Sequence, residues 1–257
     1  MFVRMKLSLR DEAGRRLLPE YAYALYSDLM ESIPQEYAQR LHEEAEMRPV
    51  SHFLVPDRNQ PGRGEFFLSL YEEEALDAFA PVLLHKTQFE LHKYGCRLNV
   101  ERMERETIDL DEMTHRCFDL AEPPTSYVLH FLSPAAFRSQ EEYVLYPTAE
   151  LILKSAMSRF QLLGSGMDAV DQNALEQMAK RARITDYTLY SRRYRVKDTT
   201  VYGFTGWVRM TIRGTLPLRQ LFRLYMTALP CTGLGLKTAM GMGGCSVEEY
   251  FPSANPK

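Results

Sequence analysis

The sequence has no long apolar segment and few cysteines. Its longest hydrophobic runs are far short of the roughly 20 residues that a membrane-spanning helix needs. The first ten residues, MFVRMKLSLR, alternate apolar with polar or charged side chains, unlike a signal peptide. The four cysteines (Cys96, Cys117, Cys231 and Cys245) form no tight framework, as expected in a reducing compartment. We therefore expect a cytoplasmic protein with no membrane partner.

The usual nucleotide-binding motifs are also missing. A Walker loop requires a Gly-Lys pair, and the chain has none. The glycine-rich stretch at 232–244, TGLGLKTAMGMGG, follows a predicted helix and precedes a predicted strand, which is the reverse of the order in a dinucleotide fingerprint. Glycines packed this densely indicate a backbone shaped for close approach. We expect a loop whose exposed N–H groups, with Lys237, hold the phosphates of a polymer.

The charge is unevenly divided along the chain. The 257 residues are 45% hydrophobic and 25% charged, with a net charge of −3, as in an ordinary globular protein. Residues 1–125 carry 15 basic and 24 acidic side chains, whereas residues 126–257 carry 16 and 10. A positive second half indicates a phosphate-rich partner, although chance surface charge gives the same pattern.

The hydrophobic periodicity predicts two halves of similar plan. Each half follows the order β-α-β-β-α-β, which predicts an α+β protein of two tandem ferredoxin-like domains. Pro123 and Pro124 mark the expected boundary, so that the domains are residues 1–124 and 125–257. The predicted strands are 2–10, 50–55, 64–72, 96–110, 126–133, 188–196, 201–214 and 243–251, and the predicted helices are 19–33, 35–47, 73–92, 147–163, 173–184 and 217–229.

A basic run at 190–197, YSRRYRVK, lies in the positive half. Strand alternation places Arg193 and Arg195 on one face and Arg192 with Tyr194 on the other. Basic side chains interleaved with tyrosines are typical of a surface that binds single-stranded nucleic acid. A charged edge strand that avoids aggregation has the same composition. The positive charge of this half favours RNA binding.

A zinc site is the competing interpretation of the histidines and cysteines. His92 with Cys96 and His115 with Cys117 give an H-x3-C and H-x-C set. The spacing matches no familiar zinc pattern, so we expect no metal and no cofactor.

Four segments in order resemble the CRISPR-associated repeat-RNA-processing endoribonucleases of the RAMP superfamily. GLGLKTAMGMG matches that family's C-terminal G-x-G-x5-G-x-G motif, with a basic residue inside, at Gly233, Gly235, Gly241 and Gly243. The segments RLHEEAEMRPVSHFLV (40–55), YVLHFLSPAAFR (127–138) and YGFTGWV (202–208) resemble its Leu-His-Glu segment, its Ser/Thr-Pro strand with Phe-Arg, and its Gly-Phe-x-Gly strand. The resemblance covers nearly the whole chain.

The resemblance implies two ferredoxin-like folds that cut CRISPR repeat RNA without a metal, leaving a 5′-hydroxyl and a 2′,3′-cyclic phosphate. His42 corresponds to the family's catalytic histidine, and a carboxylate at Glu46, one turn on, would suit it to the role of general acid. A surface histidine without a role is the alternative.

The sequence departs from the family where some members have a tyrosine and a lysine. Met30 stands at the tyrosine position, with Tyr26 one turn earlier, and Arg48 stands at the lysine position. Arginine offers bidentate donors to a phosphate but does not deprotonate. We expect Tyr26 to be the second proton carrier, with His52 as a competitor that is better explained as part of the polar face of a strand.

A non-catalytic RAMP-type RNA-binding subunit of a CRISPR effector complex is the alternative function. A ferredoxin-like enzyme unrelated to RNA is a third interpretation, which the positive second half opposes. The resemblance also leaves open other CRISPR-associated proteins and a homodimer as partners.

Overall fold

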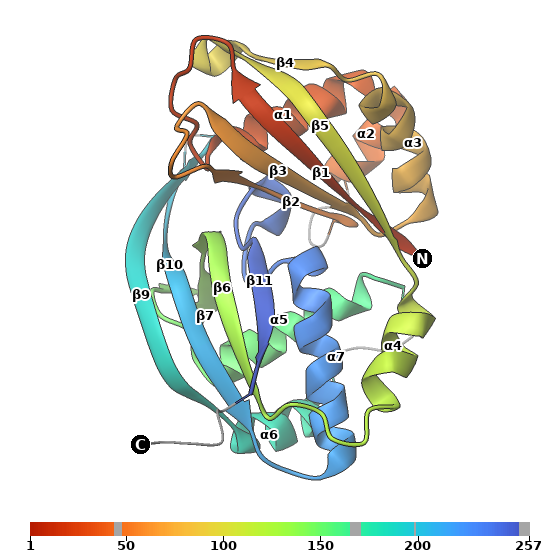
Figure 1. The fold of residues 1–257 in the computed structure, drawn as a ribbon, viewed down its shortest axis with the longest axis vertical. Helices are drawn as coiled ribbons and strands as arrows, with labels where there is room; N and C mark the ends of the chain where they lie inside the picture. Colours follow the sequence, from red (N-terminus) through yellow and green to blue (C-terminus); the bar gives the residue numbers. More distant parts are fainter. Residues whose placement is uncertain (44–47, 165–170, 198, 252–257) are drawn as a thin grey trace.

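The computed structural model describes residues 1–43, 48–164, 171–197 and 199–251 (Figure 1). Two antiparallel sheets, each with helices against one face, follow one another along the chain. The first contains five strands in the order β2-β3-β1-β5-β4, and the second four strands in the order β11-β6-β10-β9. Without the short edge strand β4, both follow the ferredoxin-like strand order. The protein therefore consists of two tandem ferredoxin-like folds, as predicted.

The first unit is built on β1. Val3, Met5, Leu7 and Leu9 are buried at every second position, which gives this strand one core-facing side. Its elements are β1 (Phe2–Asp11), α1 (Tyr21–Ser32), α2 (Gln35–Glu43), β2 (Val50–Pro56), β3 (Arg63–Leu70), α3 (Glu73–Leu84), β4 (Gln88–Leu91) and β5 (Cys96–Ile108).

The second unit is dominated by two long paired strands, β9 and β10, which rise along one side of the molecule toward the first sheet (Figure 1). Its elements are β6 (Ser126–Ala135), α5 (Ala149–Gln161), α6 (Gln172–Arg181), β9 (Ala182–Val196), β10 (Thr199–Ile212), α7 (Leu216–Thr232) and β11 (Cys245–Tyr250), with a small hairpin of β7 (Phe137–Ser139) and β8 (Glu142–Val144).

Three segments differ from the sequence prediction. The helix predicted at 73–92 ends at Leu84, and β4 follows, because Phe89 and Leu91 are buried alternately and pair with β5. The strand predicted to reach residue 110 ends at Ile108, and a helix follows, α4 (Leu110–Phe118). The strand predicted from residue 188 already begins at Ala182, which shortens the helix before it.

Helix α4 begins at an N-terminal capping residue, Asp109. The carboxylate of Asp109 accepts hydrogen bonds from the N–H groups of Asp111 and Glu112 and so begins the helix. The buried residues of α4 belong to the same core as α7. The domain boundary at residue 124 stays a prediction, and the helix before it packs with the second unit.

The glycine-rich stretch joins the two units. It forms the loop between α7 and β11, as predicted, and rises to β2 of the first sheet (Figure 1). Gly244 lies against the ring of Phe53, which itself stacks on Phe67 with ring centroids 4.7 Å apart. At the start of the stretch, the hydroxyl of Ser51 donates to the carbonyl oxygen of Cys231 at 2.7 Å. The glycines therefore allow one domain to contact the other at backbone distance.

Gly241 is the tightest point of this joint. Its φ is +92°, and a Cβ atom built there would lie 2.2 Å from the hydroxyl oxygen of Tyr194 and 2.8 Å from the Cβ of Ala22. That hydroxyl donates to the carbonyl oxygen of Met240 at 2.9 Å. A side chain at Gly241 would have to displace both neighbours and adopt a backbone conformation that L residues disfavour.

We predict that Gly241→Ala lowers the free energy of unfolding by about 2–5 kcal/mol, combining left-handed strain with overpacking. Gly14→Ala is the matched control, because its φ is +70° and no atom lies within 4 Å of its added Cβ. The control should lose about 1 kcal/mol, from backbone strain alone. Urea unfolding of both variants measures the difference, and equal losses would show that the joint tolerates a side chain.

Candidate active site

A pocket between α1 and α2 collects the three residues predicted to be catalytic. His42 comes from α2, Tyr26 from α1, and Arg48 from the segment before β2. The remaining lining residues are Tyr23, Ser27, Met30, Glu31 and Ala38. Side chains that can carry a proton or a positive charge therefore meet in one cavity, although they come from separate elements.

His42 stands on the exposed side of α2. Tyr37 and Leu41, four residues apart, are the buried positions of this helix, so the next residue points outward. A basic side chain in the last turn of a helix also interacts favourably with the helix dipole. Glu46, its predicted carboxylate neighbour, lies outside the described residues. The imidazole is thus accessible at the mouth of the pocket.

Tyr26 forms the floor of the pocket. Its side chain is buried, and its hydroxyl oxygen has no hydrogen-bond partner in the described part of the chain. Burial raises the pKa of Tyr26, and the nearby Arg48 charge only partly offsets this. The phenol therefore stays protonated at neutral pH, and it can donate a proton but not accept one. An unpaired buried hydroxyl is costly unless a ligand or a water molecule satisfies it.

Met30 lines the same pocket as Tyr26. It stands where some family members have a tyrosine, and Tyr26 lies one turn earlier on the same face of α1. The shift by one turn therefore leaves a tyrosine facing the cavity. Arg48, half-buried, supplies the positive charge beside it.

His52 is a buried residue that packs against Tyr26 and does not itself line the pocket. Its ring stacks on Tyr26 with centroids 4.5 Å apart and 16° between the planes. Burial lowers the pKa of His52 to about 3, and Arg48 adds to this, whereas the Ala239 backbone acts in the opposite direction. The imidazole is therefore neutral at physiological pH and is a poor proton donor.

The expectation that His52 belongs to a polar strand face is wrong. Every residue of β2 from Val50 to Leu54 is buried, because α1 and α3 cover one face of the strand and the glycine-rich stretch covers the other. His52 is thus a buried packing residue whose ring fixes that of Tyr26.

The glycine-rich stretch is more enclosed than the sequence suggested. The expectation of exposed N–H groups is wrong for Gly233, Gly235 and Gly243, which donate to Leu229 O, Ser155 Oγ and Pro134 O. Lys237 remains half-exposed with a φ of +56°, and its amine lies 4.0 Å from the sulfur of Met240. Gly235 and Gly243 also face carbonyl oxygens of Ala136 and Leu234 too closely to admit a side chain. RNA binding by this stretch stays a prediction, in which Lys237 is the accessible group.

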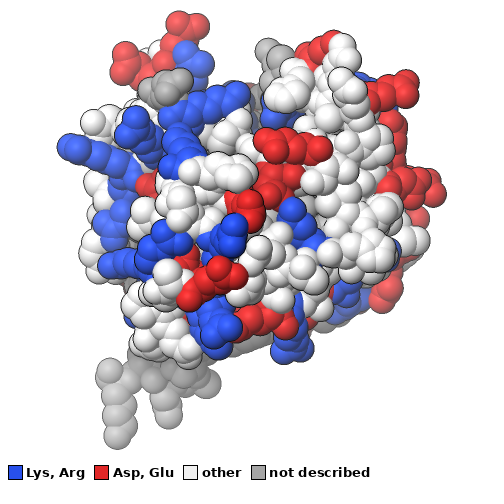
Figure 2. Space-filling view, turned by 90° about the horizontal axis from the view of Figure 1, so that it is seen from above, with Lys and Arg blue, Asp and Glu red and all other residues white. Residues whose placement is uncertain are grey.

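The basic run lies on the exposed part of β9. Arg192, Arg193 and Arg195 are exposed, and Tyr194 between them is fully buried. Arg192 lies over the ring of Tyr190 and Arg193 over that of Tyr202, at 5.5 and 5.6 Å. Seen from above, basic side chains predominate on the left of the molecule (Figure 2). These arginines and tyrosines form a surface suited to phosphates and bases.

The zinc alternative finds no support in the geometry. His92 lies in the 3-10 helix His92–Tyr94, Cys96 begins β5, and His115 with Cys117 lies on α4. Among the residues that the structure describes, no three His, Cys, Asp or Glu side chains are grouped so that they could hold a metal ion.

No described helix is long and apolar enough to cross a membrane.

The pKa of His52 has a consequence for stability. Its pKa is about 3 in the folded protein and 6.5 when unperturbed, so between these values the unfolded chain binds a proton that the folded chain does not. We predict that stability falls as the pH drops from 7 to 5, with about 2 kcal/mol arising from His52. His52→Phe, which keeps a ring against Tyr26, should remove that part of the loss. Urea unfolding at both pH values tests this, and the same pH dependence in parent and variant would contradict it.

The sequence was compared with models of protein families and with known proteins. Residues 129–245 match the family model of the CRISPR-associated endoribonuclease Cas6. A CRISPR-associated endoribonuclease Cas6 of Streptococcus thermophilus is 25% identical over 230 residues, which cover 90% of this chain and 92% of that protein. One of Mycobacterium tuberculosis is 26% identical over 234 residues, covering 89% and 72%.

The fold is also shared with solved structures. A product complex of a Thermus thermophilus Cas6 superposes with a TM-score of 0.77 at 20% identity, covering 96% of this chain and 99% of the other. The tandem ferredoxin-like folds therefore lead to the same proteins as the glycine-rich motif and the ordered segments of the sequence. Over most of its length the chain is therefore similar to the CRISPR-associated endoribonucleases Cas6, whose family model its residues 129–245 match.

Proposed function

We propose that this protein is a metal-independent endoribonuclease that cleaves CRISPR precursor RNA within its repeats. The single observation that carries the proposal is the convergence of His42, Tyr26 and Arg48 on one pocket. The relatives' names support the activity, since both are CRISPR-associated endoribonucleases. The basic surface on β9 and the positive second half supply the attraction for RNA.

The proposed reaction uses the RNA's own 2′-hydroxyl as nucleophile. His42 accepts the proton of that hydroxyl while its oxygen attacks the adjacent phosphorus. The bond from phosphorus to the 5′-oxygen breaks, and Tyr26 donates its proton to that leaving oxygen. The products are a 2′,3′-cyclic phosphate and a 5′-hydroxyl. Arg48 stabilises the extra charge on the phosphate oxygens in the transition state.

The assignment of acid and base follows from burial. The sequence favoured His42 as the acid because of Glu46, which lies outside the described residues. Tyr26 has a raised pKa and is a proton donor at neutral pH. The accessible His42 is then the group left to accept a proton, and solvent can restore both groups after each turnover.

We predict that His42→Ala lowers the single-turnover cleavage rate by roughly 10²–10⁴, the usual contribution of a positioned proton carrier. The affinity for uncut RNA should stay within about twofold, because phosphate contacts elsewhere supply most of the binding energy. His115→Ala, an exposed histidine on α4, is the matched control and should cut at the parental rate. Parental cleavage by folded His42→Ala would refute the assignment.

The same assay tests the chemistry and the alternative function. Cleavage by the parent should persist in EDTA and disappear with a 2′-deoxy nucleotide on the 5′ side of the scissile phosphate. A requirement for Mg²⁺ would contradict the proposal. A parent that binds repeat RNA tightly but never cuts it would identify a binding subunit.

We predict that Tyr26→Phe separates catalysis from folding. Its hydroxyl is buried without a partner in the described part of the chain, so its removal should leave the free energy of unfolding unchanged or slightly higher. The cleavage rate should fall by roughly 10²-fold or more if this hydroxyl protonates the leaving group. Thermal unfolding and single-turnover cleavage are measured on the same preparation. An unchanged rate would leave Arg48 as the only partner of His42.

A further inference from the structure

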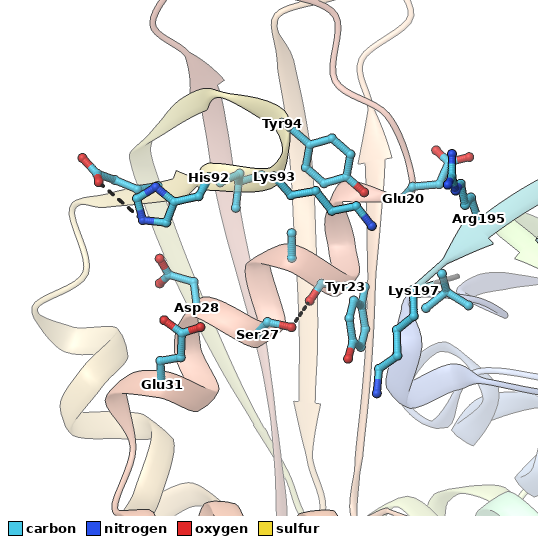
Figure 3. A pocket seen from close by; sticks show the side chains of 14 residues that line it. Glu20, Tyr23, Ser27, Asp28, Glu31, His92, Lys93, Tyr94, Arg195 and Lys197 are labelled. Carbon is cyan, nitrogen blue, oxygen red and sulfur yellow. Dashed lines mark hydrogen bonds and ion pairs between the residues drawn. The ribbon is translucent and has the colours of Figure 1, made fainter. Parts of the chain in front are cut away.

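A second groove lies beside the candidate active site and is built by both halves of the molecule. Helix α1 forms one wall, the 3-10 helix His92–Tyr94 forms another, and the end of β9 closes the third side (Figure 3). Tyr23, Ser27 and Glu31 line this groove and also line the pocket of His42. The two cavities therefore share one wall, and an RNA chain leaving the first can enter the second.

The basic side chains of the groove gather at one end, which Arg195 and the carboxylate of Glu20 also line. Lys93 and Lys197 reach toward the side that carries Tyr23 and Tyr94, whereas Asp28 and Glu31 lie further along α1 (Figure 3). The Lys197 amine lies 5.7 Å from the Tyr23 ring centroid, and that of Lys93 lies 5.9 Å from that of Tyr94. In the described part of the chain, neither lysine forms an ion pair with a carboxylate.

The two carboxylates of the acidic end differ in availability. Asp28 forms an ion pair with Lys86 and is mostly covered. Glu31 is exposed and forms no ion pair within the described residues. Of the other two carboxylates that line the groove, Glu90 pairs with Arg97, and Glu20 lies at the end that carries the lysines. Beyond the ring of Tyr23, the exposed carboxylate of the groove is therefore that of Glu31.

We propose that this groove holds a guanine nucleotide that flanks the scissile phosphate. The inference rests on the proposed function and names what the adjacent part of its substrate is. The nucleotide's phosphate lies between Lys93 and Lys197, and its base stacks on the ring of Tyr23. The amine of Lys197, 5.7 Å from the centroid of that ring, moves aside to the phosphate. This places the Watson–Crick edge of the base toward Glu31.

Guanine is the base that fits a free carboxylate. Its adjacent N1–H and N2–H groups match the two acceptor oxygens of Glu31, so both can be bonded at once. Adenine and cytosine each offer one amino group, and uracil one imino group, beside acceptors that a carboxylate repels. Glu31 is therefore the specificity-determining residue of this groove, and the lysines are its phosphate contacts.

The test measures binding of an RNA that cannot be cut, with a 2′-deoxy nucleotide at the nucleophile position. Guanosine, inosine or adenosine is placed in turn at each nucleotide flanking the scissile phosphate. At one of these positions the parent should bind guanosine about 5- to 150-fold more tightly than adenosine, the range of a bidentate base contact, with inosine between them. Glu31→Gln should lose this preference. Equal affinities of the parent for all three bases at both positions would overturn the guanine assignment.

Two further variants test the stacking and the phosphate contact. Tyr23→Ala should weaken binding by about 5- to 150-fold, and Tyr23→Phe should bind like the parent because it keeps the ring. The double variant Lys93→Ala/Lys197→Ala should reduce the salt slope of binding by about two ions. Arg58→Ala/Lys180→Ala, which removes two exposed charges outside the groove, should change the slope less.

The outcomes separate this inference from the proposed function. If the parent cuts repeat RNA while the Tyr23 and lysine variants bind like the parent, the groove is empty and the nuclease proposal stands. If the parent does not cut but the groove variants lose guanosine-dependent binding, the groove is supported and the catalytic proposal fails.

Discussion

The close contact between the glycine-rich stretch and the first sheet is the constraint on which the rest of the structure depends. Gly244 lies against Phe53, and Gly241 fits between Tyr194 and Ala22 with no room for a Cβ atom. Protein interiors are packed as densely as organic crystals, so such a contact fixes position rather than merely allowing it. The motif that resembles an RNA-binding signature is therefore first a joint between two domains.

This joint also determines the chemistry of the pocket. The stretch covers β2, and its Ala239 backbone lies beside His52. Burial keeps His52 neutral, and the neutral ring can stack under Tyr26 without the cost of a buried charge. A residue of the second half thereby orders the floor of a cavity that belongs to the first. Rigid support of this kind is what a positioned proton carrier needs.

Periodicity and turn chemistry predicted both ferredoxin-like patterns, because the first strand of each unit, β1 or β6, buries alternate residues of its own sequence. Local pattern does not separate β4 from the helix before it, since β4 is only four residues long and its burial is decided by pairing with β5. Helix α4 has a signal in its sequence, the cap residue Asp109 with Glu112 three residues later. The resemblance at His42 was enough to predict the pocket from the sequence. The burial of Tyr26 and His52 could not be predicted in this way, because it arises from packing between segments that are distant in the sequence.

The two halves of the chain carry opposite net charges. The acidic first half holds the pocket, where a strongly negative surface alone would repel RNA, and the positive second half extends β9 alongside it. Arg195 and Lys197 at the end of β9 line the groove next to the pocket, so in the proposed function the phosphate backbone of RNA would meet cations from one domain beside the proposed proton carriers of the other. A change that loosens the joint would shift those cations relative to His42. Substitutions in the glycine-rich stretch should therefore slow catalysis as well as weaken the fold, because a displacement of about 1 Å costs roughly a hundredfold in rate.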